Sequence, residues 1–255
     1  MKKTPESPIS DKQSFPEVTL TEFRGVQFLH FGTDWIQGAM RLKNPYEIVL
    51  DYVQQMMVWM LFKDKPEHIV QLGLGSAALT KFCYQQFPDT RVTAVELNPE
   101  VINICRKAFH LPEDNHRLSV LQTDAFDYIE SKKGSHEIDI IQVDLYDENA
   151  AAPVFDSPEF YLSCADVLAP DGMMTVYIFG NDSNRTKSIE AIKESFDSVV
   201  WLPEIDGGNI VILAFKKSPE VDFEVLYQRA KLIKKETKLK AVQWVNALQD
   251  WMKNT

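Results

Sequence analysis

The chain carries its hydrophobic residues in two alternating periods, and this alternation determines the predicted fold. Short apolar, β-branched runs between turn-forming residues predict buried strands, whereas apolar residues that recur every three or four positions predict helices. Strands are predicted at residues 69–72, 91–95, 118–121, 138–143, 173–179, 198–202 and 209–215. Helices are predicted at residues 77–87, 98–109, 125–131, 157–168 and 185–196. This alternation predicts an α/β fold with a doubly wound, mostly parallel, Rossmann-like sheet.

The two flanks of the chain follow other patterns. A polar start with two prolines is typical of a disordered tail. Short strands between glycine turns then predict a small N-terminal β-hairpin layer, at residues 17–24, 26–31 and 35–42. Helical spacing over residues 46–62 predicts a helix that opens at Asn44-Pro45. The predicted parts are a disordered tail, a small antiparallel β region, a Rossmann-like domain and a helical extension, at residues 1–15, 16–44, 45–218 and 219–255.

An apolar stripe runs along the charged helical segment at residues 219–254. We expect this stripe to pack on the body of the protein, and the alternative is a contact in a homodimer. The strands predicted just before it, at 198–202 and 209–215, lie close together around Gly207-Gly208. Their spacing predicts a hairpin at the edge of the sheet.

Composition narrows the class of partner. The chain has 255 residues and a formal net charge of −10, which argues against nucleic acid and suits a small cationic substrate. No apolar run approaches the ~20 residues of a membrane span, and the start of the chain lacks a signal-peptide core, so we expect a cytoplasmic protein without membrane attachment. The cysteines at 83, 105 and 164 have no CxxC spacing, which predicts neither a disulfide framework nor a metal site.

The stretch from His68 to Asn98 predicts a strand, a glycine turn, a helix and a second strand that ends at an acid. Gly73 and Gly75 permit backbone angles that a side chain would forbid, and they let a ligand approach the main chain. Glu96 follows about 20 residues after the turn, where a carboxylate can accept both hydroxyls of a ribose. The pattern predicts a nucleoside-cofactor site; the alternative is an ordinary βαβ turn with a surface glutamate.

Two further acids end the next predicted strands. Asp124 either caps the following helix or meets an adenine amino group, and Asp144 ends the apolar run at residues 140–143. Ligands of doubly wound sheets lie outside the carboxyl ends of the strands. A carboxylate at that position can orient an attacking amine and accept its proton, so Asp144 is the candidate for acid–base chemistry.

In the order of these motifs, the chain resembles the polyamine aminopropyltransferases, the spermidine synthase family, over about residues 20–215. The matching positions are Trp35-Ile36-Gln37, the helix that carries Tyr52 and Gln54-Gln55-Met56, the glycine turn, Glu96, Asp124-Ala125 and the Asp144-x-x-Asp147 loop. The resemblance implies a sheet of the S-adenosylmethionine-methyltransferase type. It also implies aminopropyl transfer from decarboxylated S-adenosylmethionine to a di- or polyamine, with release of methylthioadenosine and without a metal.

The resemblance also assigns roles to individual residues. The implied catalytic residues are Asp144, Asp147 and Tyr146. The implied cofactor-binding residues are Gln37, Gly73, Gly75, Ser76, Glu96, Asp124 and Ala125. Tyr52 and Gln54 are the implied substrate-binding residues.

The sequence departs from the family at several positions. Ser76 stands where the family's glycine loop has an aspartate that helps to hold the aminopropyl ammonium. The loop at residues 148–153 and the segment at 203–208 also differ from the family's acceptor-binding sequences. Nucleoside recognition is therefore better preserved than polyamine recognition. Two alternatives stay open: a methyltransferase that uses intact S-adenosylmethionine, and a non-catalytic nucleoside-binding protein.

Overall fold

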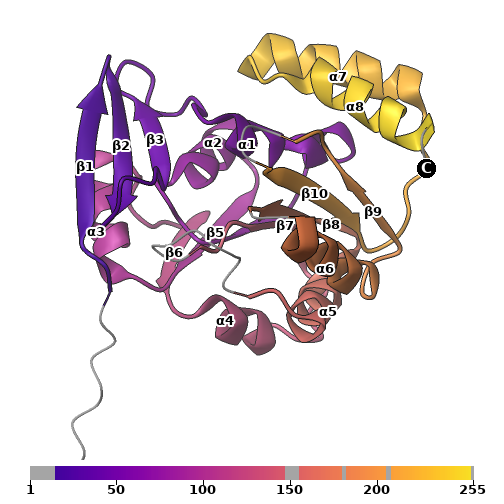
Figure 1. The fold of residues 1–255 in the computed structure, drawn as a ribbon, viewed down its shortest axis with the longest axis horizontal. Coiled ribbons are helices and arrows are strands. Elements are labelled where there is room, and N and C mark those ends of the chain that lie inside the picture. The colour runs from indigo at the N-terminus through magenta and orange to yellow at the C-terminus, as the bar shows by residue number, and fades with distance from the viewer. Residues whose placement is uncertain (1–14, 147–154, 180–181, 205–207, 254–255) are drawn as a thin grey trace, which may run out of the picture.

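A seven-stranded sheet runs through the middle of the computed structural model, which describes residues 15–146, 155–179, 182–204 and 208–253 (Figure 1). Its strands are β4 (His68–Leu72), β5 (Arg91–Glu96), β6 (Leu118–Gln122), β7 (Ile138–Val143), β8 (Leu168–Ile178), β9 (Ser198–Trp201) and β10 (Ile210–Phe215). The spatial order is β6-β5-β4-β7-β8-β10-β9. The strands from β6 to β8 are parallel, and β10 is antiparallel to both of its neighbours. The predicted doubly wound sheet and its edge hairpin are confirmed.

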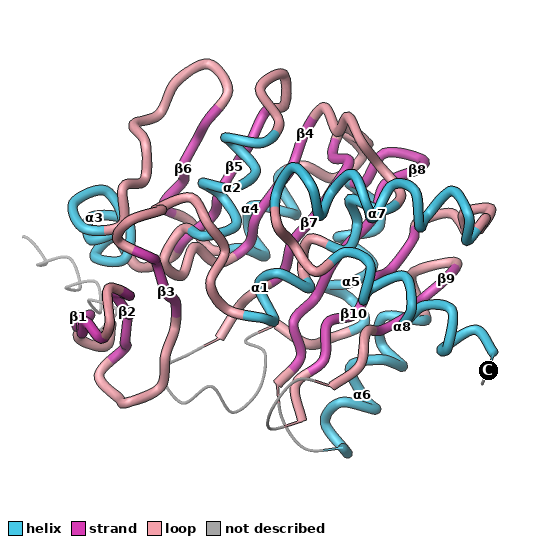
Figure 2. The backbone as a smooth tube through the Cα atoms, turned by 90° about the horizontal axis from the view of Figure 1, so that it is seen from above, coloured by secondary structure: helices cyan, strands magenta, loops and turns pink. Residues whose placement is uncertain are grey.

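Helices cover both faces of this sheet, which explains why its strands are apolar on both sides. One face packs against α1 (Asp51–Gln55), the 3₁₀ helix η1 (Val58–Leu61), α2 (Ala78–Gln86), α7 (Phe223–Thr237) and α8 (Ala241–Lys253). The other face packs against α4 (Ala125–Ser131), α5 (Pro158–Val167) and α6 (Asp182–Lys193). Figure 2 shows the helices and strands seen from above.

The N-terminal strands form a separate antiparallel sheet of β1 (Val18–Phe23), β2 (Val26–Phe31) and β3 (Gly38–Arg41). This sheet packs its apolar side on α3 (Pro99–Ala108) and on the glycine turn after β4, in a cluster that includes Leu29, Met40 and Leu74. The predicted hairpin layer is thus present, and it places the chain after β2 beside the turn. Residues 1–14 of the predicted tail lie outside the described residues.

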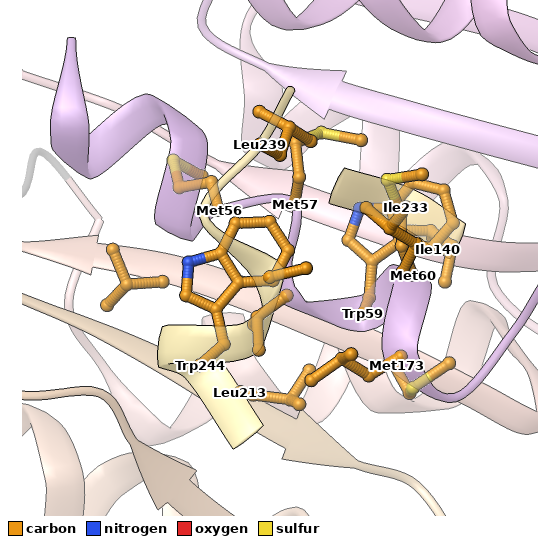
Figure 3. Close-up of a cluster of buried hydrophobic side chains, with 14 of the residues drawn as sticks. Met56, Met57, Trp59, Met60, Ile140, Met173, Leu213, Ile233, Leu239 and Trp244 are labelled. Atoms are coloured by element: carbon orange, nitrogen blue, oxygen red, sulfur yellow. The ribbon is translucent and has the colours of Figure 1, made fainter. Parts of the chain in front are cut away.

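The core on the α7–α8 face brings together residues from distant parts of the chain (Figure 3). Trp59 from η1 and Trp244 from α8 lie in it, together with Leu213 of the sheet, and all three are nearly inaccessible to solvent. The C-terminal helices therefore pack on the body of the protein, as expected for their apolar stripe. Truncating a buried tryptophan such as Trp59 to alanine is expected to cost about 3–5 kcal/mol of stability.

Three element boundaries correct the predictions from the sequence. The helix predicted at residues 46–62 does not form as one unit: its first residues form turns, and the helical part divides into α1 and η1. The Lys81 ammonium donates to the carbonyl oxygen of Pro45 at 2.8 Å, and Gln54 Nε2 donates to that of Ile48 at 3.1 Å. These contacts hold the first part of the segment in a non-helical path that apolar spacing alone does not reveal.

The other two corrections concern β8 and the C-terminal helix. β8 begins at Leu168, the last residue of the helix predicted at 157–168 and well ahead of the strand predicted at 173–179, because Leu168 pairs with Ile138 before the register shifts. The predicted C-terminal helix is two helices, since Lys238 adopts a left-handed conformation with φ of 66° and ends α7. A left-handed residue at this position terminates a helix. Among the described residues, no helix combines the length and the apolar character that crossing a bilayer requires.

Candidate functional site

A cavity of about 750 Å³ opens at the carboxyl ends of the parallel strands. It lies where the strand order reverses, between β4 and β7, which is where doubly wound sheets bind their ligands. Small-molecule sites typically enclose ~300–1,000 Å³, so the cavity has room for a nucleoside and a second substrate. Nine of the predicted site residues line it: Gln37, Tyr52, Gly73, Gly75, Glu96, Asp124, Ala125, Asp144 and Tyr146.

The glycine turn brings the main chain of β4 directly to the cavity wall. Gly73 has φ of +86°, and a Cβ added there would collide with the carbonyl oxygen of Asp144. Gly75 has φ of +51°, and a Cβ there would lie 3.0 Å from the carbonyl oxygen of Gln37. Only glycine satisfies both the backbone angle and the close approach at these positions. The turn thereby joins the N-terminal layer, β4 and β7 around one end of the cavity.

Glu96 is fixed in place by the backbone around it. Its Oε2 accepts a hydrogen bond from the amide of Leu74 at 3.0 Å, and its Oε1 accepts from the amide of Asn98 at 2.8 Å. Burial raises the pKa of Glu96, and these amides counteract that rise by stabilising the carboxylate. Each carboxylate oxygen has a second lone pair, so the group retains two acceptor sites for a ligand in the cavity.

Asp124 caps α4, which is one of the two roles that its position in the sequence predicts. Its Oδ1 accepts from the amides of Phe126 at 2.7 Å and Asp127 at 3.1 Å. Both bonds use the same oxygen, and the residue also lines the cavity together with Ala125. The cap fixes the side chain and the first backbone groups of α4 at the edge of the site, so capping and ligand binding are compatible here.

Asp144 is the carboxylate at the other end of the cavity, directly after β7. The Tyr52 hydroxyl lies 3.4 Å from its Oδ2 and donates to it. The surrounding protein desolvates the carboxyl group and raises its pKa to about 7, although the Tyr52 hydrogen bond lowers it. Burial followed by the nearby Asp144 charge also raises the pKa of Tyr52, which keeps its hydroxyl protonated as a donor.

Three tyrosines surround this carboxylate. The rings of Tyr52 and Tyr177 are stacked with centroids 4.0 Å apart, and Tyr146 meets Tyr177 edge-on at 5.4 Å. The Tyr146 hydroxyl donates to the carbonyl oxygen of Tyr177 at 3.0 Å and accepts from the amide of Phe179 at 2.6 Å. Tyr146 thus fastens the chain after Asp144 to the end of β8, which holds Tyr177 against Tyr52.

Gln37 carries an unused polar group at the cavity. Its Nε2 atom is buried and makes no hydrogen bond to any described residue. A buried amide without a partner costs free energy, so its presence beside the glycine turn indicates a ligand acceptor at this point.

The remaining predicted residues lie elsewhere. The structure places Ser76 behind the cavity wall: it is 2% exposed, it packs against Gly38, and its hydroxyl donates to the carbonyl oxygen of Ala39 at 3.3 Å. Gln54 does not line the main cavity, since its amide bonds to Ile48. Asp147 and the loop at 148–153 lie outside the described residues.

The sequence interpretation gave no role to Trp35 and did not identify the other aromatic residues of the wall, Phe155, Tyr177 and Phe179. Trp35 and Phe179 meet edge-to-face with centroids 5.9 Å apart, and with Phe155 and Tyr177 they line the cavity. Tyr177 and Phe179 stand near the carboxyl end of β8, so the strand-end rule that identified the acids could also have identified them. Their alternation within an apolar strand resembles ordinary core packing, which concealed them.

The fold and the cavity together define a protein with a Rossmann-like sheet and a small-molecule cavity at its strand ends. The model of the spermine/spermidine synthase domain family matches residues 50–224. A polyamine aminopropyltransferase of Neisseria meningitidis is 36% identical over 222 residues, which cover 86% of this chain and 84% of that protein. The polyamine aminopropyltransferase of Chromobacterium violaceum is 31% identical over 245 residues, covering 95% and 93%. This chain therefore belongs to the spermine/spermidine synthase domain family.

Solved structures show the same architecture. A probable spermidine synthase from Corynebacterium glutamicum superposes with a TM-score of 0.73 at 19% identity and covers 88% of each chain. A spermidine synthase in complex with the transition-state analogue AdoDATO superposes with a TM-score of 0.60 at 17% identity, covering 87% of this chain and 88% of that one. The expected fold, with its small antiparallel sheet ahead of the main one, is thus shared with known structures.

Proposed function

We propose that this protein transfers an aminopropyl group from decarboxylated S-adenosylmethionine to a di- or polyamine and releases methylthioadenosine. The observation that carries the proposal is the position of Asp144. It lies at the strand end next to the glycine turn, in the same cavity as Glu96, with its pKa raised towards neutrality. The sequence identity of 31–36% to bacterial polyamine aminopropyltransferases supports this class of reaction.

The nucleoside of the donor fits the end of the cavity that contains Glu96 and Asp124. The two acceptor sites left on Glu96 suit the two hydroxyls of a ribose. Asp124 and Ala125 lie at the start of α4, where a carboxylate oxygen or a backbone group can meet the adenine amino group. The unpartnered Nε2 group of Gln37 supplies a further hydrogen-bond donor for a ribose oxygen.

The amine end of the cavity supplies proton acceptance and orientation. The nitrogen lone pair of the acceptor forms a bond to the carbon next to the sulfonium, and the carbon–sulfur bond breaks with its electron pair left on sulfur. The product ammonium then carries one proton too many, and the Asp144 carboxylate takes it. Tyr52 orients that carboxylate by donating to its Oδ2. With the acceptor held beside the donor, the reaction gains from proximity as well as from proton transfer.

The acceptor side of the site is aromatic rather than acidic. The faces of Tyr52 and Tyr177 and the ring of Tyr146 surround Asp144. Aromatic faces attract alkylammonium groups and also pack against methylene chains. This wall can therefore hold a linear amine although Ser76 contributes no carboxylate to the cavity. We propose Tyr52 and Tyr146 as site residues in these roles, with Asp147 retained as a candidate from the sequence.

The test is a product assay with two donors. The purified chain is incubated with decarboxylated S-adenosylmethionine and a panel of linear diamines and triamines, and methylthioadenosine is measured by chromatography. We expect its release to require both the donor and an amine. Intact S-adenosylmethionine is the matched control donor and is expected to give no aminopropylated product. Methyl transfer from the intact donor, without aminopropyl transfer from the decarboxylated one, would overturn the proposal.

A further inference from the structure

A second cavity lies at the opposite end of the sheet from the proposed active site. Its volume is about 180 Å³, and it is formed where β4, β5 and β7 begin, against α4 and the turn that follows α4. Arg91 and Glu96 stand at the two ends of β5, which at about 3.3 Å per residue places the cavity roughly 16 Å from the ribose-binding carboxylate. We refer to it as the basal cavity.

The sheet face below α4 changes character at the basal cavity. Towards the carboxyl ends of the strands this face is apolar, as at Val95, but Arg91 and Thr93 make the first half of β5 polar on the same side. On the neighbouring strand, Ser119 pairs in register with Thr93. Polar side chains that project from a sheet below a helix require hydrogen-bonding partners.

A directed chain of hydrogen bonds ends in this cavity. Arg91 Nη2 donates to His68 Nδ1 at 3.0 Å, so the ring proton of the neutral histidine sits on Nε2, which donates to Thr93 Oγ1 at 3.0 Å. Burial raises the pKa of Tyr128, which lies beyond Thr93, and the nearby Thr93 hydroxyl counteracts part of that rise. Both donors of this chain point the same way, so that it ends at Thr93, which lines the cavity next to the largely buried Tyr128 (6% exposed).

Other donors face the same space. Ser135 Oγ is buried and makes no hydrogen bond to any described residue. Lys132 lies with its ammonium 5.8 Å from the Tyr128 ring centre and is close enough to His68 to disfavour protonation of the imidazole. Two hydroxyls and two cations, Arg91 and Lys132, therefore converge on one small cavity.

One carboxylate opposes this charge. Glu137 lines the cavity and pairs with Arg91 at 3.7 Å, with 65% of the Glu137 side chain and 52% of the Arg91 side chain exposed. An exposed ion pair at that distance contributes little to stability, so Arg91 can readily exchange Glu137 for another anion. The wall keeps a net charge of +1 in a chain of net charge −10, and its unused groups are donors.

We propose that the basal cavity binds a small oxyanion, such as inorganic phosphate or a carboxylate, between Tyr128, Ser135 and Lys132. An oxyanion supplies the acceptors that these groups lack, and charge-assisted bonds of this kind are the stronger ones. The volume equals that of about six waters, which suits an isolated oxyanion and not a nucleotide. This inference does not depend on the proposed aminopropyl transfer.

The test follows backbone amide shifts of ¹⁵N-labelled protein during titration with sodium phosphate and, separately, sodium acetate at constant ionic strength. Methylthioadenosine is present throughout to occupy the cavity at the carboxyl ends of the strands, which we call the upper cavity, so that this cavity does not contribute to the shifts. We expect saturable shifts centred on Arg91, Ser119 and Ser135. Tighter binding of phosphate identifies a divalent oxyanion as the ligand, and tighter binding of acetate identifies a carboxylate.

Three variants distinguish a built site from general surface attraction. Lys132→Gln and Tyr128→Phe are each expected to weaken binding by about fivefold or more, as the loss of one charge-assisted hydrogen bond implies. Lys133→Gln is the matched control, because Lys133 is the next residue but pairs with Glu130 at 2.8 Å outside the cavity, and it is expected to change binding less than about twofold. Equal loss in Lys132→Gln and Lys133→Gln, or the absence of saturable shifts in the parent protein, would overturn the proposal.

Discussion

The two ends of the upper cavity hold their carboxylates in opposite ways. At the nucleoside end, Glu96 accepts two backbone amides and Asp124 accepts two more. At the amine end, Asp144 accepts a 3.4 Å hydrogen bond from Tyr52 in an environment that raises its pKa to about 7. Amides that point at a carboxylate stabilise its charge, whereas aromatic rings remove water without replacing it.

This difference separates binding from chemistry. A carboxylate fixed by the backbone is a rigid hydrogen-bond acceptor, which suits recognition of a ribose. A carboxylate with a pKa near neutrality can accept a proton in one step and release it in the next, which suits an acid–base residue. Substitutions at the two ends should therefore produce different kinetic and thermodynamic effects.

The largest expected effect comes from Asp144→Asn. Loss of the proton acceptor should reduce kcat by about 10²–10⁴-fold, the range typical of general-base catalysis. Affinity for methylthioadenosine should change less than about threefold, because the nucleoside end is untouched. The measurements are steady-state methylthioadenosine release and calorimetric titration. Turnover within tenfold of the parent protein would remove Asp144 from the catalytic role.

The acids of both ends could be predicted from the sequence because of their position along the chain. Gly73, Glu96 and Asp144 each directly follow a predicted strand, Asp124 follows one within three residues, and parallel strands bring their ends to one edge. The sheet was predictable for the same reason, since its strands are short apolar runs with helical segments between them. Local pattern was sufficient wherever one element alone determined the position of a residue.

Residues whose role depends on packing between distant segments were not predictable. Ser76 belongs to the glycine turn in sequence, yet close packing on Gly38 from β3 turns it away from the cavity. Tyr177 enters the site because Tyr146 holds the end of β8 against Tyr52. Contacts of this kind join residues far apart in sequence, so no periodicity records them.

The second effect in size belongs to Glu96→Ala at the nucleoside end. The ribose would lose its charged acceptor, and the amides of Leu74 and Asn98 would lose theirs. Hydrogen bonds to charged groups contribute about 1.5–3 kcal/mol each, so methylthioadenosine affinity should fall by roughly 10–100-fold. Calorimetric titration measures this loss. Glu100→Ala, at an exposed position in the first turn of α3, is the control and should bind normally. Unchanged affinity in Glu96→Ala would contradict the assignment of the ribose site.

A smaller effect is expected from Tyr52→Phe, and it should be visible in the pH dependence of kcat/KM. In the parent protein, kcat/KM should rise as pH increases through about 7, because Asp144 must lose its proton to act as a base. The Tyr52 hydroxyl lowers the pKa of Asp144, so its removal should move this limb to higher pH. A shift of about one unit would reduce kcat/KM near pH 7 by roughly fivefold and leave it nearly unchanged above pH 9.

The same profile tests whether Tyr52 acts on Asp144 or only fills space. Tyr177→Phe is the matched variant, since it removes a hydroxyl from the adjoining ring of the stacked pair and keeps both rings. No hydrogen bond from the Tyr177 hydroxyl to Asp144 forms within the described part of the chain, so this variant should retain the parent's acidic limb. Equal shifts in both variants would show that the limb responds to the aromatic wall as a whole.

The smallest expected effect is on stability, and it has the opposite sign to the effect on activity. The pKa of Asp144 is about 7 in the folded protein and 3.8 ordinarily, so the native state binds the extra proton between about pH 4 and 7. Its contribution to the free energy of unfolding therefore falls as pH rises through this window. Asparagine cannot ionise. As pH rises from 4 to 8, the free energy of unfolding of Asp144→Asn should therefore increase by about 1–2 kcal/mol relative to that of the parent protein. This is less than the full pKa shift implies, because the carboxylate borders a solvent-accessible cavity.

Thermal unfolding of both proteins at pH 4 and pH 8 measures that gain. For a chain of this size, about 1–2 kcal/mol corresponds to roughly 2–8 °C in Tm, so the Tm of the variant minus that of the parent should be larger at pH 8 than at pH 4 by that amount. Glu96→Gln provides the comparison at the nucleoside end. The amides of Leu74 and Asn98 stabilise its carboxylate through one oxygen each. Glutamine keeps one acceptor oxygen but directs its NH2 group at the other amide, so this variant should lose stability at pH 8. If Asp144→Asn also loses stability at pH 8, the carboxylate is solvated like a surface group, and its proposed pH dependence fails with it.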